Sequence, residues 1–293
     1  MSIVVNTNIG SLNAQRSLAE SSRELSTAME RLSSGKKINS ASDDAAGFAI
    51  AERMTAQVRG LNMATKNAND GLAMLATIEN ATNDVTDMLQ RVRELAVQAA
   101  NDTNSDTDRE YLQLEVDSLL AEINRVSSQT VYNNQNVLDG SRSGTLQVGT
   151  DNGQTIAFNI ESIDTGALGL TNFEVNDVDG NAPGTADYAT TTSSLSVLDA
   201  GAAAEALDKI SIAIEQVAED RAGYGALANR LEYTVSNLMN VAEFTTAARS
   251  RIEDADFAAE SARLAKAQVL QQTGTAMLAQ ANASSQLAIQ LIR

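Results

Sequence analysis

The chain has 293 residues, a formal net charge of -17, and neither cysteine nor histidine. These two absences exclude disulfides, zinc enzymes, thiol nucleophiles and every mechanism that depends on an imidazole. Only carboxylate or Ser/Lys chemistry is left for an enzyme, and no constellation of residues suggests it, so we expect neither catalytic residues nor a cofactor. The acidic balance argues against nucleic acid as a partner, because phosphate contacts require clustered lysine and arginine.

Packing is expected along extended helix surfaces rather than around one bulky core. Hydrophobic residues make up 43% of the chain but aromatic residues only 3%. Much of the apolar count is alanine, which buries little area per residue. A single proline, Pro183, favours long uninterrupted helices. Eight of the seventeen glycines lie between Gly140 and Gly184, which indicates a β or irregular middle.

The two ends of the chain share a charge character that the body lacks. Residues 1–42 hold five basic and three acidic groups, and residues 258–293 hold three and one, whereas the body between them holds 13 basic and 34 acidic groups. No stretch approaches the ~20 apolar residues of a membrane span. The first ten residues, "MSIVVNTNIG", lack a basic region and an apolar run, so we expect neither a membrane anchor nor a cleaved secretory signal.

The first segment carries a heptad repeat, which predicts a helix with a narrow coiled-coil seam. Its two seam positions are filled by Leu18, Leu25 and Leu32 and by Ala14, Ser21 and Ala28. The repeat stops at Gly35, where we expect the helix to end in a glycine cap.

Residues 35–42, within "LSSGKKINSASDDAAGFAIAERM", contain a Gly-Lys pair but do not form a phosphate-binding loop. Glu30 and Lys37 stand where that motif needs glycine and Ser or Thr. Ser40 and Asp43 instead have the spacing of a capping box at the start of the next helix. The stretch is therefore predicted to be an inter-domain joint, with its candidate residues Gly35, Ser40, Ser42 and Asp43.

A long helical pattern follows from Ser42 towards residue 100, some 57 residues or roughly 85 Å if unbroken. Three glycines are candidates to bend it, namely Gly47, Gly60 and Gly71. The turn at residues 101–108 precedes a third helix, which we expect to fold back antiparallel. Asn104, Asp106, Asp108 and Glu115 have calcium-loop spacing, but Arg109 occupies the glycine position, so an ordinary helix N-terminus is favoured and no metal site is expected.

The period changes between residues 131 and 170, where "TLQVGTDNGQTIAFNI" predicts a β-hairpin around Asp151, Asn152 and Gly153. Residues 181–194 are turn-rich and polar, and we interpret them as a short exposed connector. Its hydroxyl cluster "ATTTSS", residues 189–194, is either a site of O-linked glycans or a linker, and the sequence favours the linker.

Helix is predicted again from near Ala200 past Ile252, with Gly223 and Gly225 as candidate interruptions. From about Phe257 the heptads return. Their first seam position includes Leu264, Leu278 and Ile292, and their second is small, with Ala267, Gly274, Ala281 and Ala288. Such helices bury too little area to be stable alone, so the two ends are expected to pair with each other and with other copies. The predicted fold is mainly α, a long antiparallel helical rod or coiled coil with a small β-hairpin region.

The chain resembles the bacterial flagellins. The matching stretches are "IVVNTNIGSLNAQRSL", "RLSSGKKINSASDDAAGFAIAERM", "GLNMATKNANDGLAMLATIE", "LQRVRELAVQAAN" and "RSRIEDADFAAESARLAKAQVLQQTGTAMLAQAN". They fall within residues 3–140 and 200–293, in the same order as in the family. The middle leaves no room for the large outer domains of many flagellins, so a short form is expected.

The resemblance implies a structural subunit of the extracellular flagellar filament, a homopolymer that serves motility. It implies export through the flagellar type III apparatus with a chaperone, and assembly under a cap next to junction proteins. Residues 1–42 and 258–293 would be the inner-core domain, unfolded in the free monomer, with Leu18, Leu25, Leu32, Leu264, Leu278 and Ile292 as its assembly core. Residues 43–180 and 195–257 would be the rod domain, with the hairpin at about 131–170. A hook–filament junction protein is the alternative within the same export route.

The segment "LQRVRELAVQAAN" has two interpretations. Its charged residues are a solvated helix face by composition alone. The resemblance implies that Arg91, Leu95, Gln98 and Glu115 match the patch bound by the vertebrate flagellin-sensing Toll-like receptor, which would then recognise shed monomer, while the same patch makes subunit contacts in the filament.

Overall fold

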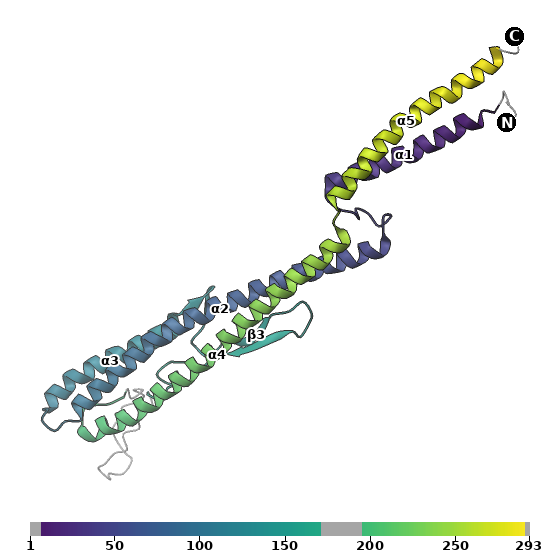
Figure 1. Cartoon of the computed structure of the whole chain (residues 1–293). Helices are drawn as coiled ribbons and strands as arrows, with labels where there is room; N and C mark the ends of the chain where they lie inside the picture. Colours follow the sequence, from purple (N-terminus) through teal and green to yellow (C-terminus); the bar gives the residue numbers. More distant parts are fainter. Residues whose placement is uncertain (1–6, 171–194, 291–293) are drawn as a thin grey trace. The chain divides into compact units, whose positions relative to one another are not determined.

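The computed structural model describes residues 7–170 and 195–290 (Figure 1). The predicted connector at residues 181–194, with its hydroxyl cluster, lies outside the described residues. The chain divides into two compact units, Met1–Arg59 with Val241–Arg293, and Gly60–Asn240. In the part of the chain that the structure describes, no helix is long and apolar enough to cross a membrane.

The first unit contains two long helices that lie side by side, α1 (Ile9–Ser34) and α5 (Phe257–Gln290) (Figure 1). Asn8 caps the start of α1, where its Oδ1 accepts from the Ser11 amide at 3.1 Å. Gly35 ends the helix with a φ of 72°, and its N–H donates to the Arg31 carbonyl. A left-handed φ favours glycine, so the predicted glycine cap is confirmed.

The next helix, α2 (Ala45–Ala99), does not begin with the predicted capping box. Its first free amides, those of Ala46 and Gly47, donate to Asp44 Oδ1. Ser40 and Asp43 close the preceding turn, in which Asp43 Oδ2 accepts from the Ser40 amide at 3.0 Å. The assignment of Ser40 as the cap was wrong, because the Ser40–Asp43 turn is complete before the helix starts and Asp44 accepts from the first helical amides.

The second unit is built around the greater part of α2, α3 (Asp106–Gln129) and most of α4 (Ala200–Glu253). α3 folds back on α2 after a short turn, as predicted (Figure 1). A continuous core joins the three helices through side chains with 0% exposure, among them Ile78, Val85, Leu89, Val92, Val116, Ile123, Ile210, Ala213 and Val217. These residues follow the helical apolar stripes of the sequence.

The predicted hairpin is confirmed. β3 (Ser143–Gln147) pairs antiparallel with β4 (Thr155–Asn159), with Leu146 opposite Ile156. A smaller pair, β1 (Val131–Tyr132) and β2 (Gln135–Asn136), precedes it.

The glycines do not interrupt the long helices. A Cβ on Gly71 would lie 2.5 Å from Leu146 Cδ1, whereas one on Gly223 would meet nothing within 4 Å. Gly71 therefore permits the close approach of the hairpin to α2, a packing role that the sequence did not predict.

Candidate functional site

The α1–α5 pair has the seam that the heptads predict. Ser21, Ala28 and Ala267 are buried, and Leu18, Leu25, Leu32, Leu264 and Leu278 are half-buried, while Ile292 lies outside the described residues. The helices are antiparallel, since the Asn8 amide donates to the Ala281 carbonyl at one end and Arg31 pairs with Glu260 at the other. The small residues let the backbones approach, but they leave the leucines incompletely covered.

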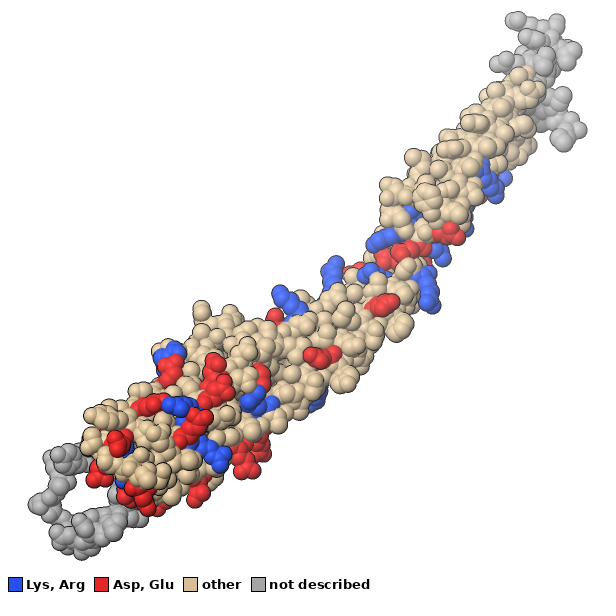
Figure 2. Space-filling model, turned by 60° about the vertical axis from the view of Figure 1, so that its left-hand side comes forward, with Lys and Arg blue, Asp and Glu red and all other residues tan. Residues whose placement is uncertain are grey.

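Large apolar side chains are also exposed on both helices. Those more than 40% exposed are Ile9, Leu12 and Met29 on α1, and Phe257, Val269, Leu270 and Met277 on α5. Beyond Lys266 the described part of α5 has no charged residue, and Figure 2 shows the corresponding stretch of the pair almost free of charge. Exposed large apolar side chains beside a charge-free stretch of helix are typical of an interface rather than of a solvated helix pair.

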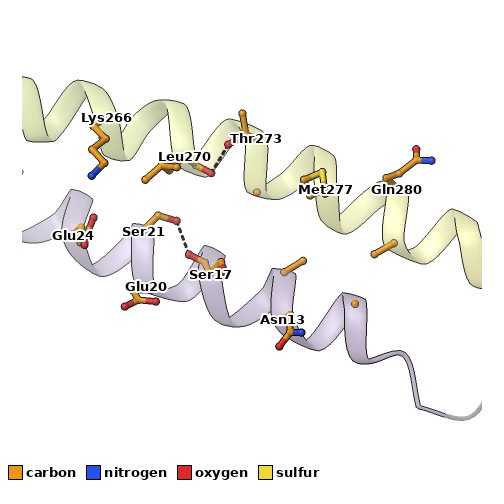
Figure 3. A pocket seen from close by; sticks show the side chains of 14 residues that line it. Asn13, Ser17, Glu20, Ser21, Glu24, Lys266, Leu270, Thr273, Met277 and Gln280 are labelled. Carbon is orange, nitrogen blue, oxygen red and sulfur yellow. Dashed lines mark hydrogen bonds between the residues drawn. The ribbon is translucent and has the colours of Figure 1, made fainter. Parts of the chain in front are cut away.

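A groove of about 700 Å³ runs between α1 and α5 (Figure 3). Most of its length is lined by small or apolar residues, including Ala14, Ser17, Leu270, Gly274 and Met277. Charged residues line only one end of the groove, namely two glutamates on α1 and one lysine on α5. A groove with this lining accepts apolar side chains and offers no set of groups for catalysis.

The base of the helix pair holds a buried carboxylate between two arginines. Glu260 Oε1 lies 3.8 Å from Arg31 Nη1, and its Oε2 lies 3.1 Å from Arg263 Nη1. The Glu260 side chain is only 6% exposed, so the ion pairs are partly shielded from water. Removal of the carboxylate would leave the Arg31 charge without its partner in a partly buried place.

The predicted joint residues lie at the surface, since Gly35, Ser40, Ser42 and Asp43 are all exposed. Amide donors of the Ser40 turn lower the pKa of Asp43 below its usual value. The backbone near Gly35 pairs with the end of α4 and the residues that follow it. In this pairing, the Lys37 amide donates to the carbonyl of Glu253, the last residue of α4. Local hydrogen bonds thus define the joint, although most of its side chains make no core contact.

The candidate receptor residues come from two helices. Arg91 of α2 donates from Nε to Glu115 Oε1 of α3 at 2.8 Å, and from Nη1 to Glu94 at 2.9 Å. Gln98 is exposed, whereas Leu95 is buried with an exposure of 1%. Three of the four predicted side chains therefore lie at the surface, and Leu95 belongs to the core beneath them.

The calcium-like spacing at the start of α3 is used for helix capping. Ser105 and Asp108 form a reciprocal capping box, and the hydrogen bonds from Ser105 lower the pKa of Asp108. Asp106 pairs with Arg109, and Glu115 with Arg91. Within residues 7–170 and 195–290, no group of three or more acidic residues is placed to hold a metal ion.

Sequence reasoning missed three polar residues of α3 that hold connecting segments to the core. Gln113 accepts from the Val197 amide and donates to the Leu195 carbonyl, at 2.7 and 2.9 Å. Asn124 accepts from Thr165, and Ser127 donates to the Leu138 carbonyl. The sequence does show polar residues next to the apolar stripe of this helix. The pattern alone does not indicate that these residues bind the backbone of distant segments.

Two long helices that pair through a narrow seam of small residues and expose large apolar side chains are typical of structural proteins whose surfaces are covered by neighbouring copies. The family model "Bacterial flagellin N-terminal helical region" matches residues 5–143, and "Bacterial flagellin C-terminal helical region" matches residues 207–292. The chain belongs to the bacterial flagellin family.

Curated relatives match along the whole chain. A flagellin of Halalkalibacterium halodurans is 38% identical over 292 residues, with 99% of this chain and 100% of the relative covered. A flagellin of Bacillus subtilis is 40% identical, with 99% of each covered. The "Flagellar filament 33 kDa core protein" of Treponema phagedenis is 38% identical, with 99% and 100% covered.

These matches confirm the short form of the family, without large outer domains. The chain is a structural subunit of the extracellular flagellar filament and not an enzyme. The filament subunit is thereby favoured over the junction-protein alternative.

Proposed function

We propose that the terminal helix pair is the inner assembly core of the filament, and that its incompletely covered leucines become fully buried when copies pack side by side. The observation that carries this proposal is the half-burial of seam leucines beside exposed apolar side chains and the charge-free stretch of α5 beyond Lys266. The half-buried residues are Leu18, Leu25, Leu32, Leu264 and Leu278, and we include Ile292, which lies outside the described residues, from its heptad position. Completing the burial of one leucine is worth about 1 kcal/mol, so a few leucines in each of many copies favour assembly strongly.

In this proposal the inner core comprises residues 1–42 and 258–293 and is unfolded in the free monomer. Residues 43–180 and 195–257 form the surrounding rod. The groove between α1 and α5 is occupied by a second copy of this chain, because its mostly apolar or small-residue lining continues the charge-free stretch of α5 beyond Lys266. Residues 35–42 are mobile in the monomer and become ordered on assembly.

A truncation and a point variant test the assembly core. Deletion of residues 258–293 is expected to abolish filaments in electron microscopy while the remaining chain stays helical by circular dichroism. Leu25→Asn is expected to raise the protein concentration needed for assembly, whereas Glu110→Gln, an exposed change on α3, serves as its matched control. Normal filaments from the truncated chain would contradict the proposal.

Hydrogen exchange tests the joint. Amides of residues 35–42 are expected to exchange rapidly in the monomer and slowly in the filament. Strong protection of these amides in free monomer would show that the joint is already ordered before assembly.

We propose that the subunit leaves the cell without a cleaved signal, through the flagellar type III apparatus with an export chaperone, and joins a filament that is bounded by junction proteins and a cap. Membership of the flagellin family supports this route. An intact N-terminal segment in secreted protein, measured by mass spectrometry, and loss of secretion without the export apparatus are the expected results. A shortened mature N-terminus would contradict it.

The free monomer is also proposed to be a ligand of the vertebrate flagellin-sensing Toll-like receptor. Arg91, Gln98 and Glu115 offer exposed polar contacts, and buried Leu95 holds α2 in place beneath them. In a receptor-reporter cell assay, Arg91→Ala is expected to reduce the response at least tenfold, and Arg125→Ala, a second ion-paired arginine of this unit, to leave it unchanged. Equal responses from both variants would refute this patch.

A further inference from the structure

Met277 places an accessible sulfur atom in the groove between the terminal helices. The chain has eight methionines and no cysteine. Met277 is 64% exposed and lines the groove with Leu270 and Gly274 (Figure 3). Three other described methionines are more than half exposed, Met29, Met63 and Met239, but none of them lines this groove. Since no thiol competes for oxidants, accessible thioethers are the sulfur groups of this chain that peroxides reach first.

We propose that Met277 is a modification site, at which oxidation by hydrogen peroxide lowers the ability of the subunit to assemble; this inference rests on the proposed assembly core. The sulfur lone pair attacks one peroxide oxygen, so an S–O bond forms, the O–O bond breaks and water leaves. Sulfur loses two electrons and the peroxide gains them. A methionine sulfoxide reductase, which takes its electrons from thiols, reverses the change.

The sulfoxide that results suits the covered groove less well than the thioether does. Oxidation turns a flexible apolar side chain into a polar one that needs a hydrogen-bond donor. Thr273, one turn before Met277, already directs its hydroxyl to the carbonyls of Val269 and Leu270. When a second copy covers the groove, the S=O group loses its hydrogen bonds to water, and mainly the side-chain amides of Asn13 and Gln280 are left to replace them. We expect the protein concentration needed for assembly to rise about tenfold.

The experiment compares treated and untreated monomer of each variant, so that every variant is its own reference. Monomer is exposed to hydrogen peroxide, the oxidised positions are mapped by peptide mass spectrometry, and assembly is followed by sedimentation. The parent chain and Met239→Leu, whose altered residue belongs to the other unit, are expected to lose assembly on treatment. Met277→Leu, which preserves volume, is expected to keep most of its untreated assembly. Reductase treatment is expected to restore the parent.

Two results would overturn the inference: an equal loss of assembly in treated Met277→Leu, or full assembly of parent chain whose Met277 is oxidised. Failure of the proposed assembly core is recognised separately, since in that case the untreated chain truncated after residue 257 still forms filaments.

Discussion

Replacement of Gln113 by leucine is expected to detach the segment at residues 195–197 from α3. The Gln113 amide acts as a short section of β-ladder, because its oxygen accepts from the Val197 amide and its nitrogen donates to the Leu195 carbonyl. Leu195 and Val197 are both almost fully buried, so neither backbone group can turn to water. Gln113→Leu leaves one donor and one acceptor unsatisfied.

The expected loss follows from those two groups. Each buried unsatisfied group costs about 1–3 kcal/mol, and the added apolar side chain offsets part of this, so the free energy of unfolding should fall by roughly 2–4 kcal/mol. Urea unfolding followed by circular dichroism measures the change, and hydrogen exchange at the Val197 amide identifies its place. Gln90→Leu, an exposed glutamine on α2, is the matched control and should change stability by less than about 0.5 kcal/mol. Equal stability of the two variants, with Val197 still protected, would refute the reasoning.

Three further changes test other contacts. Gly223→Ala should stabilise the chain by up to about 1 kcal/mol, since its Cβ meets nothing, and Gly71→Ala should give less, because Leu146 must move. Burial and nearby carboxylates raise the pKa of Asp220, which disfavours its charged form in the folded state. The contribution of Asp220 to stability is therefore fully present below its unfolded pKa and is lost as the pH rises through its raised folded pKa, so in thermal melts Asp220→Asn should gain stability relative to the parent chain as the pH rises. Glu260→Gln should raise the concentration needed for filament assembly, measured by sedimentation, because it removes the partner of Arg31.

Each of these changes has its own control and its own contrary result. Equal gains from the two glycine variants would show that the hairpin does not press on α2 at residue 71. The same pH dependence in Asp220→Asn as in the parent chain would show that the Asp220 carboxyl does not contribute to it. Glu30→Gln, an exposed change on α1, should assemble like the parent chain. If Glu260→Gln also assembles like the parent chain, the buried ion pair has no role in assembly.

The sequence predicted the helices because their apolar residues repeat with the period of the backbone itself. Heptad positions such as Leu18 and Leu25 must face one side of any helix, whatever surrounds it. The hairpin was equally predictable, since Asp151, Asn152 and Gly153 suit a turn between alternating strands. The cap of α2 was misplaced from Asp44 to Ser40, because both residues satisfy the local pattern and only backbone geometry decides between them.

The sequence by itself therefore determined the helical plan, the seam positions, the charge-poor ends and the family. Only the tertiary structure decided that the hairpin contacts α2 at Gly71, that Leu95 is core while Arg91 is surface, and that Gln113 holds the distant segment at residues 195–197. The physical reason is range: periodicity and turn chemistry act between near neighbours in the chain. The close approach of Leu146 to Gly71, and of Val197 to Gln113, joins residues about 75 and 84 positions apart, which no local pattern encodes.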